Sequence, residues 1–212
     1  MRRRSAITSG RTSRASASSA SSCTGTSGSA RSSLRRQPSN GEAAVDSPSV
    51  GKHPVACIVS GGQTGVDRAA LDVALELGVR CAGFCPRGRW AEDGPIDARY
   101  PLRETASAEP AERTRRNAQD TDATLVLCRG APAGGTAVAI EAAEAAGHPV
   151  LILDLGRAPE ADAAGAWLRT RGVRTLNVAG PRESEAPGIY HEARAFLRSL
   201  LETAPDAEAG RA

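Results

Sequence analysis

From Val55 onward, short apolar runs alternate with longer stretches in which apolar side chains recur at helical spacing. The five apolar runs are rich in Val, Ile, Leu and Cys and show almost no alternation of apolar and polar positions. Strands that are buried on both faces of a parallel sheet have this pattern. The predicted strands are residues 55–60, 80–85, 123–128, 150–155 and 174–179.

Amphipathic stretches follow each of these runs and predict five helices. They are residues 66–77, 111–120, 137–146, 161–171 and 188–201. Gly78 and Gly147 come directly after two of them, where a glycine commonly ends a helix. Five strands alternating with five helices predict a doubly wound α/β domain, with a mostly parallel five-stranded sheet and helices on both faces. We predict the strand order 2-1-3-4-5.

The first fifty residues have a different composition, dominated by Ser, Arg, Ala, Gly and Thr. Such a segment has too few large apolar side chains to offset the entropy of ordering it. We therefore predict a disordered tail (1–52), one ligand-binding domain (53–204) and a disordered C-terminus (205–212). The tail has the composition of an organelle transit peptide. The alternative is an unstructured extension or a start codon assigned too early.

Charge and aromatic content narrow the class of protein. Residues 1–50 carry eight arginines and two acidic residues, a net charge of +6, whereas residues 51–212 have a net charge of −3. A mildly acidic body with only 3% aromatic residues disfavours nucleic-acid binding. No apolar run approaches the roughly 20 residues of a membrane helix. We expect a cytoplasmic protein that binds neither nucleic acid nor membrane, unless the tail directs it to an organelle.

A glycine-rich turn, Ser-Gly-Gly-Gln-Thr-Gly, follows the first predicted strand at residues 60–65. Amides at the start of a helix point outward and carry partial positive charge, so this turn predicts a cradle for an anion. It matches neither the dinucleotide fingerprint nor the P-loop. The alternative is a tight turn without a ligand. The candidate residues are Gly61, Gly62, Gln63, Thr64, Gly65 and, for a polar edge of the ligand, Asp67.

The turn after the third predicted strand repeats this pattern with Gly134, Gly135 and Thr136. In open α/β sheets, ligands bind at the carboxyl ends of the strands, where the strand order reverses. If strands one and three are neighbours, both glycine turns border that crevice. Asn117 on the preceding helix and Glu141 on the following helix are candidates for fixing further polar edges of the ligand.

Residues 86–106 are polar and show neither helical nor strand periodicity. A loop of this length in a compact domain is usually a lid or a binding loop. Arg87 and Arg89 would clamp a phosphate, and Trp90 would stack on a planar ring. The alternative is a solvated loop or a contact between subunits.

Metal binding by side chains is not expected. Cys81 and Cys85 are four residues apart on a predicted strand, about 13 Å at 3.3 Å per residue, which is too far to share a metal. Cys57 and Cys128 lie inside predicted strands and are expected to be buried apolar groups. The three histidines show no ligand spacing.

Five blocks of sequence together resemble the molybdenum carrier family, also described as the circularly permuted YpsA-type branch of the SLOG superfamily. They are residues 60–72, 86–100, 113–127, 134–141 and 177–190. The resemblance implies a Rossmann-like fold, a homo-oligomer and binding of molybdenum cofactor, which is a pterin with a phosphate and a dithiolene-held metal. A small phosphorylated heterocyclic ligand also suits two anion cradles and a clamp for a ring. The main hypothesis is a non-catalytic binder or carrier of such a ligand.

A weaker resemblance, to the cytokinin-activating phosphoribohydrolases of the same superfamily, leaves an enzyme as the alternative. It implies a nucleoside-monophosphate N-glycosidase or another nucleotide hydrolase, in which Glu141 stabilises charge on the ribose and Arg113 holds the phosphate. Ala133 departs from that family's motif, where a proline is expected. A third possibility is a sensor that binds a nucleotide and signals to a partner.

Overall fold

The computed structural model describes residues 53–203, so the predicted terminal segments 1–52 and 205–212 lie outside the described residues. All five strands of the main sheet run parallel. They are β1 (Cys57–Val59), β2 (Arg80–Ala82), β7 (Ala123–Cys128), β8 (Val150–Asp154) and β9 (Thr175–Ala179). Each lies within a run that the apolar pattern predicted.

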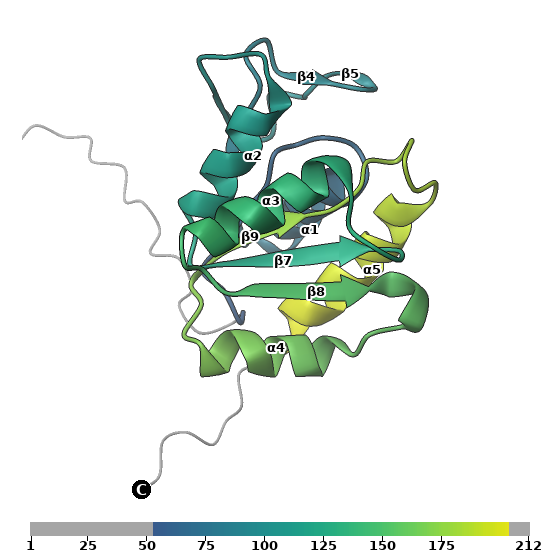
Figure 1. Cartoon of the computed structure of the whole chain (residues 1–212). Coiled ribbons are helices and arrows are strands. Elements are labelled where there is room, and N and C mark those ends of the chain that lie inside the picture. Colours follow the sequence, from purple (N-terminus) through teal and green to yellow (C-terminus); the bar gives the residue numbers. More distant parts are fainter. Residues whose placement is uncertain (1–52, 204–212) are drawn as a thin grey trace, which may run out of the picture. The chain divides into compact units, whose positions relative to one another are not determined.

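Helices cover both faces of this sheet, with α2 and α3 on one face and α1, α4 and α5 on the other (Figure 1). They are α1 (Val66–Leu77), α2 (Pro110–Gln119), α3 (Gly134–Ala145), α4 (Ala161–Thr170) and α5 (Ile189–Glu202). A single 3₁₀ turn, η1 (Leu155–Arg157), follows β8. The predicted doubly wound α/β class is therefore confirmed.

The last strand takes a different place in the sheet from the one predicted. The observed order is β2-β1-β9-β7-β8, which is 2-1-5-3-4 when the five strands are counted along the chain. The predicted neighbours 2-1 and 3-4 are present, but β9 lies between β1 and β7 and pairs with both. The prediction that strands one and three are neighbours is therefore corrected.

The burial of β9 explains why the apolar pattern did not reveal this position. Four of its five residues are buried, and Asn177 donates a hydrogen bond to the Thr124 hydroxyl inside the sheet. The more apolar β8 instead forms an edge, with Ile152 46% exposed. If β9 is counted as the first strand, the order becomes 3-2-1-4-5, the usual Rossmann order. The fold is thus a Rossmann-like sheet whose first strand comes last in the chain.

Residues 84–105 are more ordered than the irregular loop that the sequence predicted. β3 (Phe84–Cys85) pairs with β6 (Arg103–Glu104), and β4 (Trp90–Ala91) forms a hairpin with β5 (Gly94–Pro95). These short strands and α1 together enclose a small apolar cluster, separate from that of the main sheet. Its members are Leu71, Cys85, Ala91, Ile96, Tyr100 and Leu102. The segment is therefore a packed subdomain beside the main sheet, and we call it the hairpin segment.

The predicted second strand, 80–85, is divided in two at Gly83. This glycine has a φ of +146°, and a Cβ atom there would lie 2.0 Å from the carbonyl oxygen of Ser60. Only glycine combines such a dihedral with so close an approach. The chain therefore leaves the main sheet after β2 and enters the hairpin segment.

The Asp72 carboxylate joins α1, the hairpin segment and α5. It accepts hydrogen bonds from the hydroxyl groups of Tyr100 (2.7 Å) and Tyr190 (2.8 Å) and from the guanidinium of Arg99 (2.8 Å). Tyr100 is almost fully buried. Because three donors from two other elements converge on one side chain, Asp72 fixes how the hairpin segment sits against the helices.

We expect Asp72→Asn to lower the free energy of unfolding by about 1 to 3 kcal/mol, since charged acceptors make the stronger hydrogen bonds and an amide supplies only one acceptor oxygen. Urea denaturation followed by circular dichroism measures this loss. Asp162→Asn on the exposed start of α4 is the matched control. A loss no larger than that of the control would contradict the role given to Asp72.

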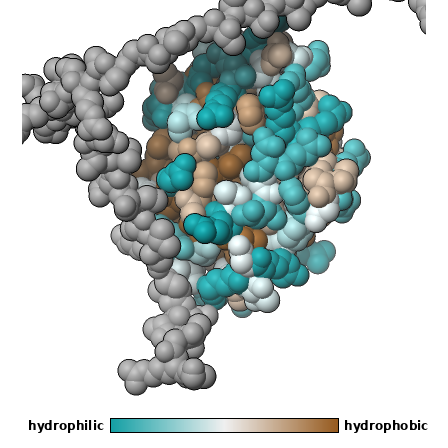
Figure 2. All heavy atoms as spheres, turned by 90° about the vertical axis from the view of Figure 1, so that its left-hand side faces the viewer, coloured by the Kyte–Doolittle hydropathy of each residue, from teal (hydrophilic) through white to brown (hydrophobic). Residues whose placement is uncertain are grey.

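The face at the amino ends of β7 and β8 mixes hydrophilic and apolar side chains (Figure 2). Within residues 53–203, no helix combines the length and the apolar character needed to cross a lipid bilayer. The hollows described below are lined by residues at the other end of the sheet, where the strands lead into their loops.

Candidate functional site

The loops that follow β1, β7 and β9 meet at the carboxyl end of the sheet. Because β9 lies between β1 and β7, its loop, residues 180–188, separates the two glycine turns. The reversal of strand order, where open α/β sheets bind their ligands, falls between β9 and β7. The β7–α3 turn therefore shares its crevice chiefly with the β9–α5 loop, and not with the β1–α1 turn as predicted.

The β1–α1 turn is closed by contacts within the chain. The amide of Val66, the first residue of α1, donates to the carbonyl of Pro181 at 3.3 Å. Gly65 has a φ of +71°, and a Cβ atom there would lie 2.5 Å from the same carbonyl. The Thr64 hydroxyl donates to the Glu92 carboxylate and accepts from the Glu183 amide at 3.1 Å.

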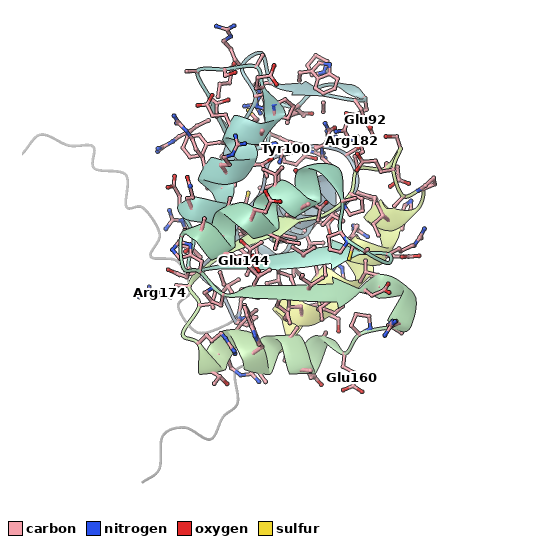
Figure 3. All side chains as sticks on the ribbon, in the orientation of Figure 1. Glu92, Tyr100, Glu144, Glu160, Arg174 and Arg182 are labelled. Atoms are coloured by element: carbon pink, nitrogen blue, oxygen red, sulfur yellow. The ribbon has the colours of Figure 1, made fainter. Side chains whose placement is uncertain are left out.

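Glu92 of the hairpin segment places a carboxylate where the sequence predicted an external anion. Besides Thr64, its donors are the amide (3.1 Å) and the hydroxyl of Ser184, and Arg182 lies 3.9 Å away. Figure 3 shows Glu92 and Arg182 close to each other. Although burial opposes the charged form, hydrogen bonds from Ser184 and Thr64 and the charge of Arg182 hold the pKa of Glu92 below its ordinary value.

The other candidates of the first turn are also engaged within the protein. The Gln63 side-chain oxygen accepts from the amides of Thr64 (3.0 Å) and Glu92 (2.9 Å). Gly61 lies under the Arg113 guanidinium, and a Cβ atom at Gly62 would meet Leu102 at 2.6 Å. These residues hold the turn against the hairpin segment and α2.

The β7–α3 turn, by contrast, is open. A Cβ atom added at Gly134 or Gly135 would find no atom within 4 Å, and the residue before the helix, Ala133, supplies no side-chain cap. Among residues 53–203, neither of the two glycine amides has a hydrogen-bond acceptor. Thr136 is only 4% exposed, and its hydroxyl has no partner in the described part of the chain. The start of α3 therefore presents three unused polar groups.

Thr136 lines two adjoining hollows. The larger, which we call the α3 hollow, has a volume of about 290 Å³. One wall is apolar and is built from Ala131, Pro132, Ala133, Pro181 and Ala186. The smaller, of about 40 Å³, lies among Thr136, Gly135, Arg113 and Arg182, with Gln63 and Asp67 from the first turn at its border. The predicted convergence of the two glycine turns is thus limited to this narrow space.

Asp67 and Arg113 neutralise each other across the small hollow. Arg113 Nη1 donates to Asp67 Oδ2 at 2.7 Å, and both side chains are largely buried.

Asn117 accepts a hydrogen bond from the amide of Phe84 (2.7 Å) and donates one to its carbonyl (3.1 Å), which positions β3. Glu141 lies exposed on α3 and lines none of the three hollows. The pair Arg113 and Glu141, required by the hydrolase alternative, is not assembled at either hollow.

The three candidates of the predicted lid lie in the hairpin segment, away from the α3 hollow. Arg89 uses its guanidinium to bind four backbone carbonyls of its own segment, those of Ile96, Asp97, Tyr100 and Leu102. Trp90 is 51% exposed in β4. Arg87 is exposed, and its amide donates to Ser107. Arg89 therefore shapes the hairpin segment, and none of the three lines a described hollow.

A larger cleft of about 590 Å³ opens between α1, α5 and the hairpin segment, and sequence reasoning missed it. Its floor is the group of Asp72, Tyr100 and Tyr190. Burial and the hydrogen bond to Asp72 raise the pKa of Tyr190 to about 12. These three polar groups bind one another through the Asp72 carboxylate. No motif in the sequence pointed to it.

Sequence reasoning also left out Arg182 and Glu185, which line the small hollow beside Thr136. Both belong to the block 177–190, which carried part of the family resemblance.

Within residues 53–203, no three His, Cys, Asp or Glu side chains lie close enough to hold a metal ion.

The chain thus has a Rossmann-like sheet with an uncapped helix start at its point of strand reversal, the position at which open α/β sheets bind their ligands. The chain belongs to the circularly permuted YpsA SLOG family, whose model matches residues 58–201. This confirms the resemblance, and the permutation agrees with the place of β9 in the sheet.

One similar solved structure is described as "Putative molybdenum carrier protein" from Syntrophus aciditrophicus SB. It is 38% identical to this chain, with a TM-score of 0.67, and the match covers 71% of this chain and 97% of that one. No curated protein matches the chain.

The Glu92 contacts predict that acid weakens the attachment of the hairpin segment. Because the pKa of Glu92 is lower in the folded protein than in the unfolded chain, its contribution to stability is present above the ordinary value near 4.5 and is lost as the pH falls through the folded value. Glu92→Gln should therefore be less stable than the wild type at pH 7, with the difference shrinking towards pH 3.

Urea unfolding at pH 7, 5, 4 and 3 measures this difference. Glu160→Gln, at an exposed position before α4, is the control (Figure 3). A difference between wild type and Glu92→Gln that stays constant with pH would show that Glu92 gains nothing from its charge.

Proposed function

We propose that this protein is a non-catalytic binder or carrier of a small phosphorylated heterocycle, and that the ligand lies in the α3 hollow. The observation that carries the proposal is the Thr136 hydroxyl, which lines both hollows without a partner among residues 53–203, next to the two free amides of Gly134 and Gly135. At the small hollow the Nε of Arg113 is buried without a partner, although a buried polar group normally has one. Three unused donors at a helix start are well suited to the oxygens of a phosphate.

The apolar wall of the hollow supports a ligand that has a ring as well as a phosphate. Three net hydrogen bonds of about 1 kcal/mol each and a helix dipole of about 0.3–1 kcal/mol give only millimolar-scale affinity. A planar ring against Pro132 and Pro181 would add apolar burial. The volume of about 290 Å³ is close to the lower end of ordinary ligand pockets, roughly 300 Å³.

Molybdenum cofactor is the ligand that we propose within this class. The name printed for the Syntrophus structure supports a carrier role, and the family supports binding of a small ligand. In this cofactor the pterin dithiolene holds the metal, so the protein needs no cluster of metal-binding side chains. Gly134, Gly135 and Thr136 would hold its phosphate. A homo-oligomer stays a prediction.

Thr136→Val keeps the volume of the side chain and removes its hydroxyl. We expect this change to weaken binding of a pterin phosphate monoester about three- to tenfold, because one hydrogen bond to a charged group is lost. Pterin fluorescence, measured in titrations with the folded protein, gives the affinity. Thr170→Val at the exposed end of α4 is the matched control.

The same titrations with the unphosphorylated pterin and with a nucleoside monophosphate test the ligand class. The proposal requires the phosphorylated pterin to bind more tightly than both. If the Thr136→Val variant and the wild type bind the phosphorylated pterin with equal affinity, the α3 hollow is ruled out as the binding site. Release of free base from the nucleotide, lost in Glu141→Gln, would support the hydrolase alternative instead.

A further inference from the structure

Three arginines lie around the α3 hollow and its smaller neighbour, and they differ in how far they are already engaged. Arg113 is paired with Asp67. Arg129 uses all three of its guanidinium nitrogens, two on Glu192 and one on the carbonyl of Pro187. Arg129 therefore has little capacity left for a guest, whereas the Nε of Arg113 is buried without a partner among residues 53–203.

Arg182 differs from both, because it is accessible to a guest and also incompletely engaged. Its Nε lies 3.2 Å from Glu185 and 3.9 Å from Glu92, and its two terminal nitrogens have no partner in the described part of the chain. Its side chain is one-third exposed and borders the small hollow together with Gly135 and Thr136. Arg182 therefore has two free guanidinium NH2 groups beside the open start of α3.

The carboxylates of Glu185 and Glu92 position Arg182, and they also repel an anion that binds beside it. Glu185 lines both hollows, and its other oxygen accepts from the Arg182 amide at 3.3 Å. Glu92 is fixed by Thr64 and Ser184, whereas Glu185 is about half exposed and has only Arg182 as its partner among residues 53–203. Glu185 is thus the carboxylate that competes most directly with a bound anion for Arg182.

We infer that Arg182 completes the phosphate site at the start of α3 and that Glu185 competes with the bound phosphate for this guanidinium. The inference rests on the proposed function and adds how binding at that site is limited. A guanidinium that stays paired with an internal carboxylate binds a guest less tightly than a free one. Such competition suits a carrier, because it keeps the bound group exchangeable.

The experiment titrates inorganic phosphate and the pterin phosphate monoester into single variants, using ³¹P nuclear magnetic resonance and pterin fluorescence at fixed low salt. Arg182→Gln should weaken binding of both probes about tenfold or more, since contacts to a charged group are lost. Glu185→Gln should strengthen binding about two- to fivefold, since an exposed ion pair is weak. Gln at 185 retains an acceptor for the Arg182 amide.

The controls separate a local effect from a change in net charge. Arg174→Gln and Glu144→Gln make the same charge changes at exposed positions, before β9 and on α3, outside both hollows (Figure 3 labels both residues). In the Arg182→Gln background, Glu185→Gln should no longer strengthen binding beyond the Glu144→Gln control. Arg182→Lys is a second variant that keeps the charge without the planar fork, and it should show an intermediate loss.

The outcomes distinguish this inference from the proposed function. If Thr136→Val weakens binding while the variants at 182 and 185 equal their controls, only the inference fails. If Glu185→Gln weakens binding, Glu185 is a ligand-positioning group and the competition is refuted. If neither the wild type nor Glu185→Gln binds either probe, both proposals fall. Binding of the probes to Glu185→Gln alone would support the competition directly.

Discussion

The position of β9 between β1 and β7 is the constraint on which the architecture of the site depends. A central strand that comes last in the chain brings its loop, residues 180–188, between two turns that precede it by fifty to more than a hundred residues. On one side, the Pro181 carbonyl meets Val66 and leaves room only for glycine at position 65. On the other side, the same loop forms a wall of the α3 hollow.

Two turns with similar sequences therefore have different chemistry. The first has its hydroxyl, at Thr64, bound to a carboxylate of the same chain, whereas the second has a hydroxyl, at Thr136, that lines the two hollows and has no partner among residues 53–203. An internal anion makes the first turn a structural joint. Within the described residues, the second turn binds no such carboxylate, so it is the candidate site for binding a ligand. Local sequence does not distinguish these roles, because the partner groups come from distant segments.

Much of the fold follows from the apolar pattern alone. The runs and helices were placed within a few residues, and the bounds of α1 and β7 agree fully. The strand order was not accessible in this way, since the buried residues of β9 resemble those of any inner strand. In the site, Gly134, Gly135 and Thr136 could be found from their turn. Arg182 and Glu185 could not, because the block 177–190 that contains them shows no spacing typical of a known chemistry. The short strands of the hairpin segment and its contacts with α1 were also missed, because its polar residues show no strand periodicity.

The hairpin segment shares a small apolar cluster with Leu71 of α1 and is otherwise held to α1 by hydrogen bonds and ion pairs. Because such contacts can break without exposing the core of the main sheet, this part of the molecule has the properties of a separate cooperative unit. Its amide protons would exchange with solvent through partial opening, at a lower free energy than those of β7 and β9. Proteases would then reach residues 84–105 first, and cleavage there would leave a nicked molecule whose central sheet stays assembled.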